Sequence, residues 1–281
     1  MSKPFRIDIE KVITEKNPTL AKRLPKFVVN YIKKIVHQEE INDFLDKHKD
    51  VKNIEFIDAV LDVFRNKLNY FGLENIDKTK KYIFVANHPL GGLESLGFIK
   101  MIDSVFPGKV KFFVNDILLN IQNLSDIFVP INKYGKQNKT SAIHSDIVYK
   151  SDNQILYYPA GLVSRRFKGK VMDLPWKKSV FKKAAQYKRD VIPVFIDAKN
   201  SERFYRLFHI RKLLGIKANI ELFFLVDEMF RYHDKKIDYY VGKPIPYSIF
   251  SDNKKLDFIT KKLQNFVHFY LKKDIYANFT L

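Results

Sequence analysis

The segment 85–95, Val-Ala-Asn-His-Pro-Leu-Gly-Gly-Leu-Glu-Ser, holds a histidine and a glutamate at a spacing that suits acid–base chemistry. It follows an apolar, β-rich run, and Pro89 with Gly91-Gly92 predicts a tight turn before the next helix. His88 is therefore expected at a strand end, and Glu94 in the first turn of a helix. A carboxylate there can fold back to the imidazole, fix its tautomer and stabilise the imidazolium. Because free histidine titrates at about pH 6.5, His88 suits a general base.

The residues alone leave another interpretation of this segment open. In that interpretation His88 is a partly buried loop histidine, and Glu94 is a favourable charge at a helix N-terminus. A metal site is not predicted, because no second histidine lies nearby and no His-Glu-x-x-His spacing occurs. The sequence has no cysteine, which excludes disulfides, thiolate metal sites and cysteine nucleophiles.

A second segment, 155–170, combines a predicted strand with a cluster of basic residues. The turn Pro159-Ala160-Gly161 at the end of this strand can expose backbone N–H groups. The polar and basic side chains that follow predict an anion clamp for a phosphate or carboxylate; they are Ser164, Arg165, Arg166 and Lys168. A solvated basic loop is the alternative for the same residues.

Short apolar runs alternate with helical patterns from residue 81 onward, which predicts an α/β domain. Strands are expected at 82–85, 110–114, 127–131, 154–158, 191–196, 219–226 and 238–241. Helices are expected between them at 93–104, 140–150, 176–187 and 201–214, with a last one at 253–272. The preceding residues read as helical around 27–37, 40–46 and 54–70. We therefore predict an N-terminal helical subdomain at 1–76 and a catalytic domain at 77–281.

The net charge of +19 and the pI of about 9.7 indicate a polyanionic partner, or a lysine-rich surface that only aids solubility. No apolar stretch approaches the roughly 18 residues of a membrane-spanning helix, and the first residues do not resemble a signal peptide. Nucleic acid, anionic lipid and a phosphate-bearing metabolite are all compatible with this charge, which does not choose among them. With anionic lipid as the partner, we expect a peripheral protein on the cytoplasmic face of a membrane. Its basic N-terminal helices are candidates for the lipid interface, with Lys22, Arg23, Lys26, Lys33 and Lys34 beside Phe27, Val28, Tyr31 and Ile32.

Asn87-His88, followed by a loop and an acid, resembles the first signature of the glycerolipid and lysophospholipid acyltransferase superfamily. In most members four residues separate the histidine from an aspartate, whereas five separate His88 from Glu94. The segment is similar to a bacterial branch often labelled hemolysin-like, which carries Asn-His-Pro-Leu-Gly-Gly-Leu-Asp. That branch includes O-acyltransferases of amino-acid-containing lipids. Within it, only the exchange of aspartate for glutamate remains as a difference.

Three further blocks extend the resemblance, so that it runs from Ala86 to Ile196. Segment 155–170 resembles the Phe-Pro-Glu-Gly-Thr-Arg block, with Pro159 and Gly161 in place and Ala160 instead of glutamate. Segment 128–136 stands at the position of the second block, where Lys133 is the candidate for a substrate contact. Segment 191–196 resembles the fourth block, a strand that helps to shape the acyl pocket, and it suits an ordinary core strand equally well.

The resemblance implies a glycerol-3-phosphate acyltransferase-like architecture, with a mixed, mostly parallel sheet flanked by helices. It implies transfer of a fatty acyl group from an acyl carrier protein or coenzyme A thioester to a lysolipid hydroxyl, with His88 as base, Glu94 as its partner and no cofactor. Acceptors compatible with it are 1-acylglycerol-3-phosphate, another lysophospholipid or an amino-acid lipid with a free hydroxyl, and the variant blocks favour the last. The implied substrate-binding residues are Asn87, Gly91, Gly92, Lys133, Pro159, Gly161, Ser164, Arg165 and Arg166.

Two further expectations concern the chemistry. Backbone donors at Gly91 and Gly92, or in the turn 159–161, are candidates for stabilising a tetrahedral oxyanion. A lipid or thioester hydrolase that uses the same histidine on water is the nearest alternative. A nucleic-acid-binding protein is the alternative from another class, favoured by the charge and by 25 Phe and 15 Tyr, but no binding motif supports it. We expect no nucleic-acid partner.

Overall fold

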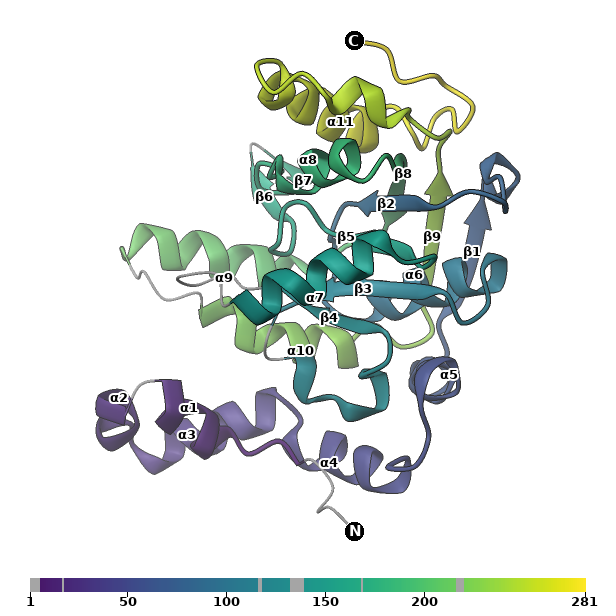
Figure 1. Cartoon of the computed structure of the whole chain (residues 1–281). Helices are drawn as coiled ribbons and strands as arrows, with labels where there is room; N and C mark the ends of the chain where they lie inside the picture. The colour runs from purple at the N-terminus through teal and green to yellow at the C-terminus, as the bar shows by residue number, and fades with distance from the viewer. Residues whose placement is uncertain (1–5, 17, 116–117, 132–138, 168, 216–219) are drawn as a thin grey trace.

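The computed structural model describes residues 6–281 except 17, 116–117, 132–138, 168 and 216–219 (Figure 1). In that part of the chain, seven strands form one sheet in the order β1-β9-β8-β2-β5-β3-β4, and two more form a separate hairpin. The sheet strands are β1 (Lys67–Phe71), β2 (Tyr82–Ala86), β3 (Val110–Val114), β4 (Phe128–Pro130), β5 (Gln154–Tyr157), β8 (Asp190–Asp197) and β9 (Lys236–Val241). The hairpin consists of β6 (Arg165–Phe167) and β7 (Lys170–Met172).

Strands β8, β2, β5, β3 and β4 lie side by side in that order and run parallel to one another. Strand β9 pairs with β8 in the antiparallel direction, and β1 pairs parallel with β9. The predicted α/β fold with a mixed, mostly parallel sheet is confirmed. Because β2 and β5 are parallel neighbours, the loops that follow them leave the sheet at the same edge.

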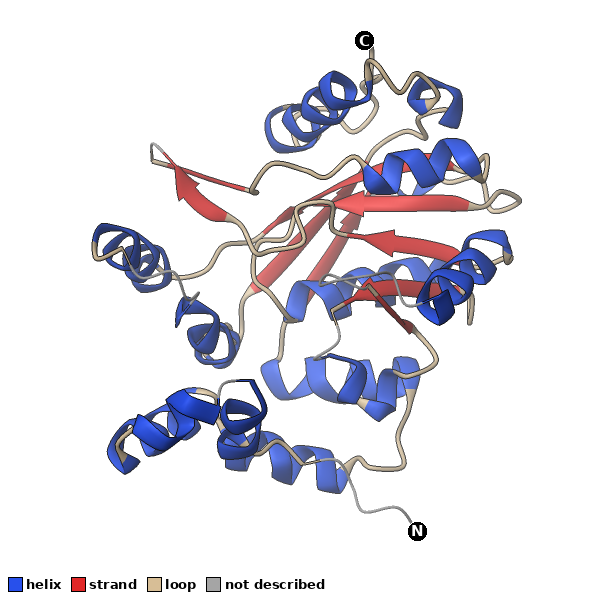
Figure 2. Cartoon of the chain, turned by 60° about the vertical axis from the view of Figure 1, so that its left-hand side comes forward, coloured by secondary structure: helices blue, strands red, loops and turns tan. Residues whose placement is uncertain are grey.

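Helices cover both faces of the sheet (Figure 2). The helices are α1 (Ile9–Lys16), α2 (Pro18–Arg23), α3 (Lys26–Ile35), α4 (Gln38–Lys47), α5 (Asn53–Phe64), α6 (Leu93–Val105), α7 (Lys139–Lys150), α8 (Ser179–Gln186), α9 (Glu202–Leu213), α10 (Phe224–Phe230) and α11 (Leu256–Phe269). Short 3-10 turns lie at Leu73–Asn75, Leu118–Asn120, Gln122–Leu124, Ile220–Phe223 and Tyr247–Phe250.

The central strand β2 shows how the core is divided. Tyr82, Phe84 and Ala86 point into one apolar cluster, and Ile83 and Val85 point into another. Helices α5 and α6 complete the first cluster, while α8 and α11 complete the second. A strand buried on both faces needs apolar side chains at every position, which is why its sequence is a continuous apolar run.

One predicted helix ends earlier than the sequence indicated. The pattern 54–70 predicted a single helix, but α5 ends at Phe64 and Arg65 takes a left-handed conformation with φ 49°. Residues 67–71 then form β1, which pairs with β9 at the edge of the sheet. Apolar residues at Leu68 and Tyr70 fit the alternation of a strand as well as a helical face, and pairing with β9 decides between them.

The predicted strand at 219–226 is also wrong over its described part. Residues 220–223 form a 3-10 turn, and α10 begins at Phe224. A short apolar run does not distinguish a strand from a helix. Glu221 within this run is fully buried in an ion-pair network with Arg165 and Arg211, so a distant pairing determines its place. The other six predicted strands are confirmed, with small differences at their ends.

Among the N-terminal helices, α4 and α5 contribute residues to the first core cluster, whereas α1 and α3 pack against α10. Ile9, Ile13 and Val36 form a small apolar cluster that includes Val226 of α10. The ring of His37 stacks on Phe230 at a centroid distance of 3.8 Å. The division at residue 76 stays a prediction, although β1 shows that the sheet already begins before that residue.

Candidate active site

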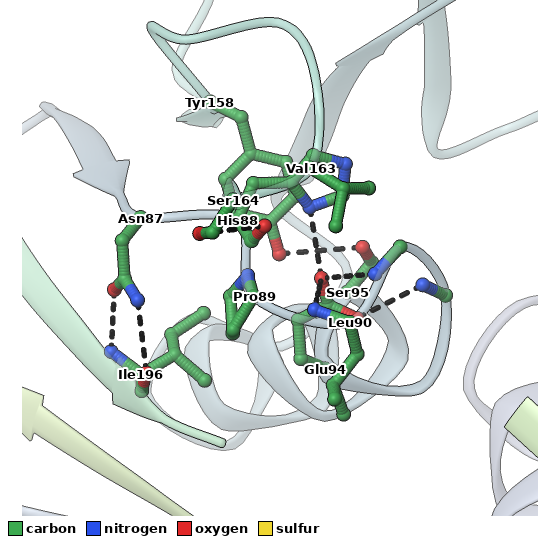
Figure 3. A network of polar contacts seen from close by, with 12 residues as sticks. Asn87, His88, Pro89, Leu90, Glu94, Ser95, Tyr158, Val163, Ser164 and Ile196 are labelled. Carbon is green, nitrogen blue, oxygen red and sulfur yellow. Dashed lines mark hydrogen bonds and ion pairs between the residues drawn. The ribbon is translucent and has the colours of Figure 1, made fainter. Parts of the chain in front are cut away.

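The loop after β2 leads to the predicted acid–base pair (Figure 3). Its first residue, Asn87, anchors the loop to the sheet. The Asn87 amide nitrogen donates to the carbonyl of Ile196 at 2.9 Å, and its oxygen accepts from the Ile196 N–H at 2.7 Å. These two bonds join the ends of β2 and β8. Asn87 is 3% exposed, and both polar atoms of its side-chain amide are bonded within the protein.

His88 and Glu94 meet as the spacing predicted. His88 Nδ1 lies 2.8 Å from Glu94 Oε1. An ionised carboxylate only accepts hydrogen bonds, so Nδ1 carries a proton, and in the neutral form of the ring the lone pair is on Nε2. Glu94 is fully buried, whereas the His88 side chain is 15% exposed. The histidine is thus the member of the pair that a substrate can reach.

The Glu94 carboxylate is also the cap of the tight turn in front of α6. Its Oε1 accepts the N–H groups of Leu90 at 3.0 Å and Gly91 at 2.7 Å, and its Oε2 accepts that of Gly92 at 2.9 Å. Burial raises the pKa of Glu94, but the hydrogen bond and charge of His88 and the glycine N–H groups outweigh it, so the pKa lies below its usual value. Glu94 is therefore a carboxylate at neutral pH.

One face of the His88 imidazole packs on Tyr158, the residue after β5. The two rings stack with centroids 4.1 Å apart and an interplanar angle of 17°. Burial raises the pKa of the Tyr158 phenol well above its usual value, and the charges of Glu94 and Asp173 add to that effect. Tyr158 is therefore a neutral platform that holds the ring. The sequence pattern indicated only a strand residue at this position.

Asp173 is a second buried carboxylate at the site, and no motif in the sequence pointed to it. Its Oδ1 accepts the backbone N–H of His88 at 3.2 Å and the hydroxyl of Ser164 at 2.6 Å. Its Oδ2 accepts the indole N–H of Trp176 at 2.8 Å. Its sequence signal is an acidic residue directly before the apolar turn Leu174-Pro175-Trp176.

The predicted anion clamp takes a different form. Arg165 is 2% exposed, and its guanidinium lies 3.1 Å from Glu221. Its second anchor is the carbonyl of Val163, at 2.7 Å. Ser164 is buried as well, and its hydroxyl donates a hydrogen bond to Asp173. Burying a guanidinium requires a charged partner nearby, and this pairing turns Arg165 inward.

Arg166 is the basic residue of this block with the more accessible side chain. It is about a quarter exposed, forms a bidentate pair with Glu202, and lies over the ring of Tyr205. Lys133 and Lys168 lie outside the described residues. Of the predicted basic side chains in the described part, Arg166 is thus the one open to solvent.

The backbone donors suggested for an oxyanion are engaged within the protein. The N–H groups of Gly91 and Gly92 donate to Glu94, and the N–H of Gly161 donates to the carbonyl of Tyr158 at 3.0 Å. The turn that begins at Pro159 thereby places Tyr158 beneath the imidazole. Gly91 and Gly161 shape their turns through left-handed conformations, with φ 102° and 66° respectively.

A family model for acyltransferases matches residues 11–277. The chain belongs to this acyltransferase family. A lyso-glycine lipid O-acyltransferase of Bacteroides thetaiotaomicron is 44% identical over 250 residues, which cover 89% of this chain and 92% of the relative. A protein of the same name from Phocaeicola vulgatus is 40% identical over 250 residues, covering 89% and 90%. The predicted acyltransferase superfamily and enzyme class are confirmed.

The acyltransferase also has a neighbour among solved structures. This is the 1-acyl-sn-glycerophosphate (LPA) acyltransferase PlsC from Thermotoga maritima, with a TM-score of 0.47 and 17% identity over 90% of this chain and 95% of that chain. Among the described helices of the acyltransferase, none combines the length and the apolar character needed to cross a bilayer. Its described residues contain no group of three or more histidine and acidic side chains placed to hold a metal ion.

Proposed function

We propose that this acyltransferase moves a fatty acyl group from a thioester to the free hydroxyl of a lyso-glycine lipid. The observation that carries the proposal is the His88–Glu94 pair, 2.8 Å apart, in a chain that is 44% identical to a relative of that name. The thioester is an acyl carrier protein or coenzyme A conjugate, and the chain itself supplies the acid–base groups. We propose that no cofactor takes part.

In the proposed mechanism, His88 Nε2 removes the proton from the acceptor hydroxyl as its oxygen attacks the thioester carbonyl. The resulting tetrahedral intermediate collapses and the C–S bond breaks. His88 gives its proton to the leaving sulfur, so that the product is a free thiol and the imidazole is neutral again. Glu94, kept ionised and buried, stabilises the imidazolium during these steps. The carboxylate thus contributes most when the ring is charged.

The headgroup of the proposed acceptor ends in a carboxylate, and Arg166 is the candidate to bind it. The side chain is partly exposed and presents a planar fork of N–H donors, which matches a carboxylate. At present the fork donates two hydrogen bonds to the carboxylate of Glu202, in bidentate geometry. A substrate carboxylate would compete with Glu202 for the same donors.

We further propose that the enzyme works as a peripheral protein on the cytoplasmic face of an anionic membrane. Apolar side chains are exposed on α3, where Phe27 is 74% and Tyr31 52% exposed, and at the end of α9, where Leu213 is 87% and Leu214 66% exposed. A net charge of +19 complements anionic lipid. Sedimentation with liposomes should therefore require anionic lipid and weaken with salt; indifference to both would contradict membrane attachment.

The direct test is transfer of a labelled acyl group from acyl carrier protein and from coenzyme A to purified lyso-glycine lipid, with products identified by mass spectrometry. His88→Ala should lower kcat by about 10²–10⁴-fold, because general base catalysis is lost. His144→Ala, an exposed histidine on α7, is the matched control and should retain activity. Unchanged transfer by His88→Ala would overturn the mechanism.

Three outcomes of this assay distinguish the proposed function from the alternative functions. Acylation of 1-acylglycerol-3-phosphate in preference to lyso-glycine lipid would replace the proposed acceptor. Release of free fatty acid at the same rate with and without acceptor would make the protein a hydrolase. Acylation of lyso-glycine lipid that depends on His88 would support the proposal.

A further inference from the structure

The β6–β7 hairpin holds the backbone of His88 from both sides. The register pairs Arg165 with Met172, so Ser164 and Asp173 are the next residues at its open end. The Ser164 N–H donates to the carbonyl of His88 at 2.7 Å, while Asp173 Oδ1 accepts the N–H of His88 at 3.2 Å. Both polar groups of one residue are thus bound by one hairpin.

The hairpin end is itself anchored to the core by Asp173. Its side chain is fully buried and accepts hydrogen bonds from three segments, namely from the backbone of His88, the hydroxyl of Ser164 and the indole of Trp176. His268 of α11 lies beside this carboxylate, with its Nε2 3.7 Å from Asp173 Oδ2. A buried carboxylate is costly unless its lone pairs are filled, so this set of donors fixes where Asp173 stands.

We propose that Asp173 is a positioning residue for His88. It fixes the backbone from which the imidazole projects, while Glu94 and Tyr158 fix the ring, so that Nε2 keeps one direction toward the substrate. The inference rests on the proposed function, in which His88 is the base. A misplacement of about 1 Å at a reacting group can cost about 10²-fold in rate, so loss of this hold acts on kcat.

Asp173→Ala removes the acceptor for the His88 N–H and should lower kcat by about 10–10²-fold, with KM for both substrates nearly unchanged. Asp173→Asn keeps the volume and an oxygen that can accept the same N–H, and it should recover part of the rate. The matched control is Asp190→Asn, since Asp190 also accepts a backbone N–H, that of Tyr247 at 3.0 Å, from the opposite end of β8. The control should retain kcat.

A second readout observes His88 directly and does not depend on turnover. In ¹⁵N-labelled protein, Asp173→Asn should speed hydrogen exchange at the His88 amide and shift or broaden its Nδ1–H resonance, while the control leaves both unchanged. If Asp173→Ala does not fold, the Asn variant alone carries both readouts. Wild-type kcat in folded Asp173 variants, or unchanged His88 resonances beside a reduced kcat, would overturn the positioning role.

The two proposals fail separately. If the wild-type protein acylates no lipid hydroxyl, the proposed function fails, and the exchange and resonance of His88 still decide whether Asp173 holds it. If His88→Ala abolishes transfer but Asp173→Ala matches the wild type in kcat, the function stands and the positioning role does not. A fall in kcat with altered His88 resonances and unchanged KM supports both.

Discussion

The His88 loop and the basic block at 159–173 are neighbours at one edge of the sheet, yet their side chains are held in different ways. In the loop, the hydrogen bonds of the Glu94 carboxylate join residues no more than six positions apart, as between His88 and Glu94. In the basic block, Arg165 and Arg166 find their partners 56 and 36 positions away, at Glu221 and Glu202. Local spacing thus determines how Glu94 meets His88 in the first region. Distant partners determine which charges of the second remain available.

The largest effect that tests this contrast is expected from Arg165→Ala. The change leaves the buried Glu221 with fewer partners, and loss of one member of a buried ion pair costs about 3–5 kcal/mol of unfolding free energy. Thermal and urea unfolding measure that cost. Below the melting temperature, KM for the lipid acceptor should stay unchanged, because the guanidinium faces the interior.

Arg166→Ala is the matched comparison from the next position. Its pair with Glu202 lies at the surface, so the melting temperature should hardly change, whereas KM for lyso-glycine lipid should rise. The reverse pattern, in which Arg165→Ala raises KM without loss of stability, would show that the buried arginine binds substrate after all. It would also remove the contrast between the two regions.

The next effect in size is expected from Glu94→Gln in the loop itself. The amide nitrogen of glutamine must face one or more of the N–H groups that Glu94 accepts, and a buried donor left without a partner costs about 1–3 kcal/mol. Transfer should fall less than in His88→Ala, because the base remains. Steady-state kinetics beside denaturant unfolding separate these two effects.

The dependence of this stability difference on pH follows from the direction of the pKa shift. The pKa of Glu94 is lower in the folded protein than its ordinary value of 4.5, so the ionised carboxylate stabilises the fold above that value. As the pH falls through the lowered pKa of the folded state, the folded protein takes up the proton and this stabilisation is lost. The gap between wild type and Glu94→Gln should therefore narrow in acid, and a gap that widens would contradict the assignment.

How well the sequence predicts an element of the fold depends on whether local residues or distant partners determine that element. Strands such as β2 are apolar at every position, and their burial on two faces leaves a clear signal. Strand β1 lies at an edge, with residues that are half-buried or exposed, and its pattern overlapped with that of a helix. Residues 220–226 were misassigned because an ion pair to Arg165 holds Glu221 inside, and no local pattern records such a partner.

The residues of the site likewise fall into those that local sequence predicts and those that distant contacts bring in. The pairing of His88 with Glu94 follows from a turn of known shape, which the Pro and Gly residues of the loop indicate. Tyr158 and Asp173 reach the imidazole and the backbone of His88 only because β5 and the β6–β7 hairpin end beside β2. Their roles depend on strand order, and strand order requires long-range contacts that a single sequence does not specify.

The smallest of these effects concerns the turn that makes the local contacts possible. Gly91 has φ 102°, and a Cβ at this position would lie 3.0 Å from Val163 Cγ2 and 3.1 Å from Leu225. Gly91→Ala should cost about 1–2 kcal/mol from backbone strain, and it should also reduce transfer because the strained turn displaces Glu94. Gly108→Ala is the control, since Gly108 has φ 69° but no atom within 4 Å of an added Cβ. It should show a comparable loss of stability without loss of kcat, because Gly108 lies outside the loop; equal losses of activity in the two variants would mean that the loop has no special sensitivity.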